Sequence, residues 1–202
     1  MSSQTRKYTL KRRADSQSET RRRIVEATAA LHDEVGPART TVAEIARRAG
    51  VQRLTVYNHF PDEAELFAAC GDHWMAQNPP PDPTAALLIE DAVERVRAVL
   101  GPVYRWYRAN ARMNEHLQRD RLLMPSLDAA MRIRLEHVFL ALGEALVAGF
   151  SPPPRSAQRV RAAVSLALDF WTWRRLANQG LSDDDAASLM VDAVKAACVA
   201  QG

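Results

Sequence analysis

The sequence has 202 residues and is poor in several residue types that mark other classes of protein. It has two cysteines, Cys70 and Cys198, without the Cys-x-x-Cys spacing of metal or redox sites, which excludes a disulfide-stabilised scaffold. No apolar run approaches the roughly 18 residues that a membrane helix needs. The N-terminus is polar and basic and lacks the apolar core of a signal peptide. From these absences we expect a cytoplasmic protein with reduced thiols.

The sequence also lacks the short motifs of common enzyme classes. It has no glycine-rich phosphate loop, no nucleophile elbow and no His-Glu-x-x-His zinc motif. Cys70 and His73 supply only two of the four ligands of a zinc site, and His116 with Asp120 has the spacing of an ordinary helical pair. We expect no catalytic site, no metal and no cofactor. The alternative is a small all-α enzyme or a ligand-binding module that has lost DNA binding.

Alternating strand patterns of useful length are missing too, whereas apolar residues recur at spacings of three and four. The sequence therefore predicts an all-α fold. Residues 78–83 hold four prolines and cannot lie inside a helix. We place a domain boundary there, between a helix-turn-helix domain at 18–77 and a helical effector-binding and dimerisation domain at 84–202. A basic tail at 1–17 precedes the first domain.

Capping signals divide the first domain into helices. Residues 16–19 (Ser-Gln-Ser-Glu) have the form of a capping box and predict the start of the first helix. Residues 41–44 (Thr-Val-Ala-Glu) form a second capping box, and this helix is predicted to end at Gly50. A third helix is expected at 52–59. An N-cap and early acidic residues at 62–65 predict the start of the fourth.

Proline and glycine positions divide the second domain in the same way. We expect helices there at roughly 84–109, 126–149, 155–179 and 183–200. The segment 111–123 is also expected to be helical, with a less regular pattern.

Two short helices separated by Gly50 are typical of a helix-turn-helix, in which the first helix braces the second for entry into the DNA major groove. In the second helix we expect Leu54, Val56 and Phe60 to pack inward, while the polar residues between them face outward. On spacing alone, the alternative is an ordinary corner between two helices with a solvated outer face.

The polar residues around this corner have the donors and acceptors that duplex DNA needs. Gln and Asn pair with adenine, Arg pairs with guanine, and Thr, Tyr and His reach phosphates. Residues 1–60 hold 12 Lys and Arg against 6 Asp and Glu, whereas residues 61–202 hold 15 against 18. A membrane surface would satisfy this charge equally well. The predicted DNA-binding residues are Thr40, Thr41, Arg47, Arg48, Gln52, Arg53, Thr55, Tyr57, Asn58 and His59.

The stretch GPARTTVAEIARRAGVQRLTVYNHFPDEAELFAAC resembles the DNA-binding region of the TetR family of bacterial transcriptional regulators. The resemblance covers roughly residues 20–72. It implies a homodimer that binds a palindromic double-stranded DNA operator, a small-molecule effector in the C-terminal domain, and repression that the effector often relieves. The residues in family register are Gly36, Thr40-Thr41-Val42, Ile45-Ala46, Ala49-Gly50-Val51, Thr55-Val56-Tyr57, His59-Phe60 and Glu65-Leu66.

Two positions depart from the family pattern. Gln52 stands where the family commonly has Ser at the start of the recognition helix, and Glu63 stands where it commonly has Lys. Gln caps a helix less well but reaches a base edge, whereas Glu63 would repel a phosphate if it faced one. We expect Arg47, Arg48 and the basic tail to compensate.

The tail and the start of the first helix together contribute eight basic residues. We hypothesise that part of this region follows the minor groove or the DNA backbone. The alternative is a solvated, disordered leader. The eight residues are Arg6, Lys7, Lys11, Arg12, Arg13, Arg21, Arg22 and Arg23.

The second domain has many large apolar and aromatic residues at helical spacing, most of which we expect in its core. A helical bundle lined by Met and aromatic residues, with a few polar groups, also suits an apolar ligand. The candidate ligand-binding residues are Tyr104, Tyr107, Asn110, Met113, His116, Met124, His137, Asp169, Phe170 and Trp173.

Apolar stripes on the last two predicted helices indicate a dimer. Two such helices from each of two subunits make a four-helix interface with two-fold symmetry. The alternative is that the stripes close the core of the monomer. The stripe residues are Leu166, Phe170, Trp173 and Leu176 on one helix and Leu189, Met190, Val194 and Ala197 on the other.

Overall fold

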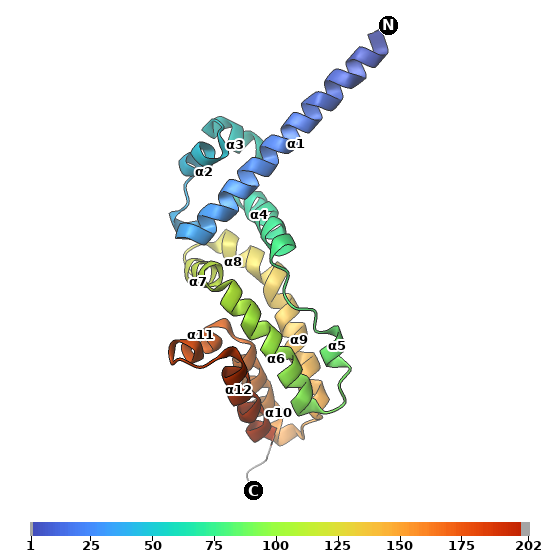
Figure 1. Cartoon of the computed structure of the whole chain (residues 1–202), viewed down its shortest axis with the longest axis vertical. Coiled ribbons are helices and arrows are strands. Elements are labelled where there is room, and N and C mark those ends of the chain that lie inside the picture. The colour runs from blue at the N-terminus through green and yellow to red at the C-terminus, as the bar shows by residue number, and fades with distance from the viewer. Residues whose placement is uncertain (1, 199–202) are drawn as a thin grey trace. The chain divides into compact units, whose positions relative to one another are not determined.

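The computed structural model describes the backbone of residues 2–198 and the side chains of residues 14–198. The regular elements in this part of the chain are all helical, as predicted (Figure 1). None of the described helices is long and apolar enough to cross a membrane. The chain forms two compact units, which consist of Met1–Asn78 with Glu115–Ala130, and of Pro79–Asn114 with Met131–Gly202.

The first unit packs four N-terminal helices around one apolar core. Ile24 and Leu31 of the first helix meet Ile45, Val56 and Phe60 in this core. Two shorter elements from later in the chain, the end of α7 and most of α8, belong to the same unit. The elements are α1 (Ser2–Val35), a 3₁₀ turn η1 (Pro37–Arg39), α2 (Val42–Ala49), α3 (Arg53–His59), α4 (Glu63–Gln77), α7 (Ala111–Asp120) and α8 (Pro125–Met131).

Helix α1 begins at Ser2, so the predicted start at residues 16–19 is wrong. Residues 2–19 contain neither proline nor glycine, and nothing in this stretch interrupts a helix. The Thr20 hydroxyl donates to the Ser16 carbonyl oxygen at 2.9 Å, a bond that forms inside a helix. Glu19 bonds to Arg22 instead of closing a capping box.

The other helix boundaries of the first unit follow the predicted capping signals. The Thr41 hydroxyl accepts from the Glu44 amide at 3.2 Å, and Asp62 accepts from the Glu65 amide at 2.7 Å. Gly50 ends α2 in the left-handed conformation, with φ of 64°. This conformation costs glycine little because it has no Cβ, and it turns the chain sharply toward α3.

The second unit is a bundle in which α6, α9, α10 and α12 pack around one apolar core. Its elements are α5 (Thr84–Leu87), α6 (Ala92–Ala109), the start of α7, a π-helical turn η2 (Arg132–Glu136), α9 (His137–Phe150), α10 (Pro154–Leu168), α11 (Phe170–Asn178) and α12 (Asp183–Cys198).

Two predicted helices of this unit are broken in the structure. The helix expected at 84–109 separates into α5 and α6, and the helix expected at 155–179 separates into α10 and α11. Asp169 causes the second break, because its backbone is extended and its carboxylate accepts from the Thr172 amide at 2.7 Å. One residue thus ends α10 and caps the N-terminus of α11.

Candidate nucleic-acid interface

Helix α3 presents a mostly polar surface. It is anchored by Val56 and Phe60, which are 2% and 3% exposed. Gln52, Arg53, Tyr57 and Asn58 are exposed, and Thr55 and His59 are half-buried, so this predicted set lies on the outer surface of one helix. The expectation for Leu54 was wrong, because its side chain is 65% exposed. Positions 54 and 56 lie two residues apart and therefore on nearly opposite sides of a helix.

The exposed polar side chains of α3 are available to a ligand. Within the described part of the chain, no hydrogen bond or ion pair engages the side chains of Gln52, Arg53, Tyr57 or Asn58. Gln52 occupies the N-cap position of α3 and makes no capping hydrogen bond with its side chain, as expected for a glutamine there.

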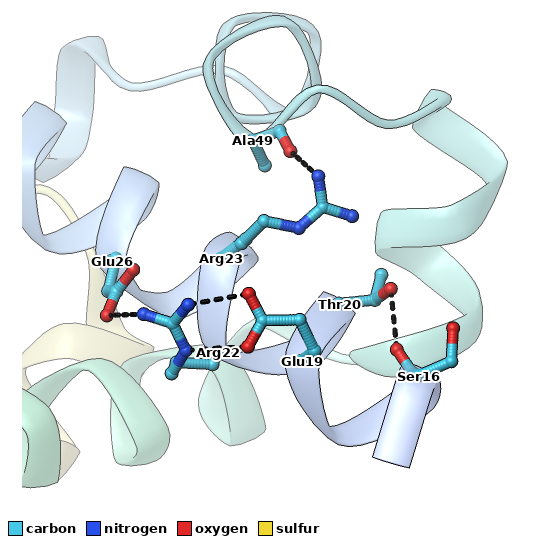
Figure 2. Close-up of polar contacts among 7 residues, drawn as sticks. All are labelled: Ser16, Glu19, Thr20, Arg22, Arg23, Glu26 and Ala49. Carbon is cyan, nitrogen blue, oxygen red and sulfur yellow. Dashed lines mark hydrogen bonds and ion pairs between the residues drawn. The ribbon is translucent and has the colours of Figure 1, made fainter. Parts of the chain in front are cut away.

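Two arginines of α1 hold the ends of α2 and α3. Arg21 donates from Nη1 to the His59 carbonyl oxygen at 2.8 Å, and its guanidinium lies 4.1 Å from the centre of the Phe60 ring. Arg23 donates from Nη1 to the Ala49 carbonyl oxygen at 3.0 Å (Figure 2). Carbonyls at a helix C-terminus lack intrahelical partners, and a cation there is favourable. Helix α1 thus fixes both helices of the helix-turn-helix.

Arg22 lies between these two residues in the sequence but forms a surface network. It pairs with Glu19 and with Glu26, at 2.6 Å and 2.5 Å (Figure 2). Three of the eight basic residues assigned to a DNA-contact hypothesis, Arg21 to Arg23, therefore have partners within the first unit.

The predicted residues of α2 are also engaged. Arg48 forms two hydrogen bonds with the Glu34 carboxylate, at 2.7 Å and 2.8 Å, and Arg47 pairs with Glu44. The Thr40 hydroxyl donates to the Gly36 carbonyl oxygen at 2.9 Å. A carboxylate offsets each arginine, which weakens the expected compensation for the departures at positions 52 and 63.

Glu63, the second departure, has a partner on α8. The Ser126 hydroxyl donates a short hydrogen bond to the Glu63 carboxylate. This bond joins the first turn of α4 to the segment 115–130 within one compact unit. The carboxylate is therefore oriented by α8, a constraint that the local sequence around position 63 does not reveal.

Asp120 is a residue whose structural role the sequence did not reveal. It is 1% exposed and accepts from the Ala38 amide at 3.0 Å and from Arg119 Nε at 2.6 Å. Burial raises its pKa, but these hydrogen bonds outweigh burial, so the pKa lies below its usual range. A Cβ at Gly36, where φ is 93°, would lie 2.5 Å from Asp120 Oδ2. Asp120 thus fixes the turn that leads into α2.

His116, the residue expected to pair with Asp120, has a different partner. Its Nδ1 lies 3.1 Å from the His32 carbonyl oxygen. The His32 ring is buried, and its Nδ1 lies 3.6 Å from Cys70 Sγ. Burial lowers the pKa of His32 to about 4 and raises the pKa of Cys70 to about 12. A neutral imidazole and a protonated thiol therefore stand together in the core at neutral pH.

Four of the predicted ligand-binding residues form an aromatic cluster in the second unit. The Tyr107 ring centre lies 5.4 Å from that of Phe170 and 5.8 Å from that of Trp173. The hydroxyls of Tyr104 and Tyr107 donate to the Ala167 and Leu168 carbonyl oxygens, at 2.8 Å and 2.6 Å. Burial raises the pKa of both tyrosines. Their polar atoms thus hold the C-terminal end of α10.

The remaining predicted ligand-binding residues do not form one lining with this cluster. Asn110 and Met113 are buried in the second unit, whereas His137 and Asp169 are exposed there. His116 and Met124 lie in segment 115–130, which belongs to the first unit. Sequence spacing grouped them because it does not show where a compact unit is interrupted.

The chain matches a family of known proteins in the region that carries this surface. Residues 24–70 match the model of bacterial regulatory proteins, tetR family. The HTH-type transcriptional regulator TtgR of Pseudomonas putida is 43% identical over 63 residues, which is 31% of this chain and 30% of that protein. An uncharacterized HTH-type transcriptional regulator of Mycobacterium tuberculosis is 43% identical over 56 residues, 28% of this chain and 30% of that protein.

Solved structures share the fold along most of the chain. A TetR-family transcriptional regulator from Streptomyces coelicolor matches with a TM-score of 0.61 and 18% identity, over 89% of this chain and 80% of that chain. NalD of Pseudomonas aeruginosa, the secondary repressor of a multidrug efflux pump, matches with a TM-score of 0.57 and 19% identity, over 92% and 98%. Through residues 24–70, this chain belongs to the TetR family of bacterial regulatory proteins.

Proposed function

We propose that this protein is a transcriptional regulator that binds double-stranded DNA by inserting α3 into the major groove. The observation that carries the proposal is the set of exposed, unpartnered polar side chains on α3. The backbone of this helix is held by Arg21 and its apolar side by the core. Because binding then orders only side-chain tips, little conformational entropy is lost.

Each exposed side chain has a chemical role in this proposal. Arg53 donates to guanine O6 and N7, while Asn58 and Gln52 pair with adenine. Tyr57 donates its free hydroxyl to a phosphate, and Thr41 presents the N-terminus of α2 to the backbone. Base contacts then specify the sequence, and phosphate contacts set the register.

Leu54 adds an apolar contact that the sequence reading missed. A leucine that is 65% exposed on the reading surface costs solvation in the free protein. The thymine methyl group is the apolar feature of the major groove. We assign Leu54 to such a methyl group.

We also propose a two-fold dimer formed through α10 and α12. Most of the predicted stripe residues, among them Trp173 and Val194, lie in the core of their own chain, which agrees with the alternative reading for them. Leu166 and Leu189 remain 57% and 48% exposed and are available to a partner. A two-fold axis would place two α3 helices on a palindromic operator.

The proposed effector is a small apolar molecule that binds in the second unit at the aromatic cluster of Tyr107, Phe170 and Trp173. Aromatic rings provide large apolar contact area with defined geometry, which supports this assignment. Repression, and its relief by the effector, follow from the family resemblance.

Selection of bound fragments from random duplex DNA, followed by titration of the selected duplex at two salt concentrations, tests the proposal. We expect a two-fold symmetric site and an affinity that falls steeply with salt, because phosphate contacts release counterions. Failure to enrich any duplex, with the free protein and with a panel of apolar effectors, would refute a DNA-binding function.

A further inference from the structure

A groove borders α3 on the side of α1. Ala14, Gln17, Ser18 and Arg21 line its α1 wall, and the α3 wall consists of Thr55, Asn58 and His59. We name it the α1–α3 groove. No carboxylate lines it, although the first unit has many acidic residues. Such a groove suits an anionic, hydrogen-bond-accepting occupant.

The donors along this groove are unused. Within the described residues, the side chains of Gln17, Ser18, Thr55 and Asn58 make no hydrogen bond. Arg21 adds a positive charge to the α1 wall, and Glu65, 3.1 Å from its Nη2, offsets part of that charge. Two walls of neutral donors with one cation match the environment of DNA phosphates, which proteins contact through hydroxyl and amide groups as well as basic ones.

The charges of α1 are distributed unevenly around the helix. Glu19 and Glu26 lie on the side away from the groove, where both pair with Arg22 (Figure 2). Helical spacing places positions 7 and 11, which are lysines, in one row with positions 14 and 18. The groove side of the helix therefore continues as a basic row toward the N-terminus, where α1 extends beyond α3 (Figure 1).

We propose that the α1–α3 groove binds one sugar–phosphate strand of the DNA whose bases α3 reads, so that α1 is a second DNA-binding element. Ser18 and Gln17 donate to phosphate oxygens from the α1 wall, and the extension of α1 follows the same strand. Asn58 lies between the groove and the reading surface and joins the two contacts. This inference rests on the proposed DNA-binding function.

Two serines of α1 provide a matched test. Ser18 lines the groove, whereas Ser16 is exposed about 160° away around the helix and lies outside it. Ser18→Glu and Ser16→Glu change the net charge equally, so any general electrostatic effect is shared. Both variants are titrated with the selected duplex by fluorescence anisotropy at several salt concentrations, after circular dichroism shows equal helix content.

We expect Ser18→Glu to weaken binding about tenfold at 0.1 M salt and Ser16→Glu to change it less than about twofold. Ser18→Arg should strengthen binding and steepen the slope of log affinity against log salt by about 0.9, the value for one added phosphate contact. Equal effects at positions 16 and 18 would overturn the inference while leaving the proposed function intact.

Two other outcomes also decide the matter. If the unmodified protein binds no duplex, the proposed function and this inference both fail. If Ser18→Glu binds DNA normally but loses binding to phosphatidylserine vesicles that the unmodified protein binds, the groove faces a membrane surface and the inference is wrong.

Discussion

Arg23 donates a hydrogen bond from Nη1 to the Ala49 carbonyl oxygen at 3.0 Å and so joins α1 to the last residue of α2. The Arg23 side chain is half-buried, and its Nε is buried without a partner. The bond lies beside the turn at Gly50, where the direction of α3 is set. Helix α1 therefore takes part in orienting the reading helix.

Arg23→Ala should destabilise the first unit by about 1–3 kcal/mol, because it leaves a helix-terminal carbonyl without its charged donor. Arg22→Ala is the matched control. Its exposed pairs with Glu19 and Glu26 should contribute less than about 1 kcal/mol. Urea denaturation followed by circular dichroism compares the two variants, and equal destabilisation would show that the Ala49 contact has no special role.

Acid should destabilise the first unit through His32. Burial lowers the pKa of this residue from 6.5 to about 4, despite the opposing charge of Asp120. Between these values the unfolded chain takes up a proton that the folded chain does not. Stability is thus complete above pH 6.5 and falls by about 3 kcal/mol as the pH approaches 4.

His32→Gln tests this origin of the pH dependence. The variant should lose stability less steeply between pH 6.5 and 4 in the same urea experiment, whatever its stability at neutral pH. A variant with the unchanged pH dependence would assign the effect to other groups.

The helix-turn-helix could be predicted from the sequence because its signals are local. Thr41, Gly50 and Asp62 each act on a turn that lies within three residues of them. The bonds from Asp120 to Ala38 and from Ser126 to Glu63 join residues 82 and 63 positions apart, and no local pattern encodes such pairs.

Other differences arose where a local signal was present but unused. The Ser-Gln-Ser-Glu segment at 16–19 lies inside α1, since a capping box does not end a helix that continues before it. Asp169 was read as a ligand-binding polar group, yet it is the N-cap of α11. An isolated aspartate between two apolar stripes permits both readings.

Leu54 should make binding sensitive to the thymine methyl group. Replacing the thymines of the selected duplex, one at a time, by deoxyuridine removes this methyl and should weaken binding about five- to tenfold at one position per half-site. Leu54→Ala should bind the two duplexes equally at that position. If no single replacement has an effect on the unmodified protein, Leu54 contacts no methyl group.

Tyr107→Phe should destabilise the second unit by about 1–3 kcal/mol, because the buried Leu168 carbonyl loses its hydrogen-bond donor. Tyr57→Phe removes a hydroxyl that has no partner in the described structure and should leave stability unchanged. Thermal unfolding of both variants gives the comparison. Equal melting temperatures would mean that the Tyr107 hydroxyl does not stabilise the end of α10.

The most direct test of the account is to repeat the DNA selection with Arg53→Ala and Tyr57→Phe. If α3 reads bases through Arg53 and contacts phosphate through Tyr57, the first variant should lose its preference for guanine at one position per half-site. The second should select the same sequence and bind it more weakly. Identical sequence preferences and affinities for both variants and the unmodified protein would contradict the claim that this surface of α3 reads DNA.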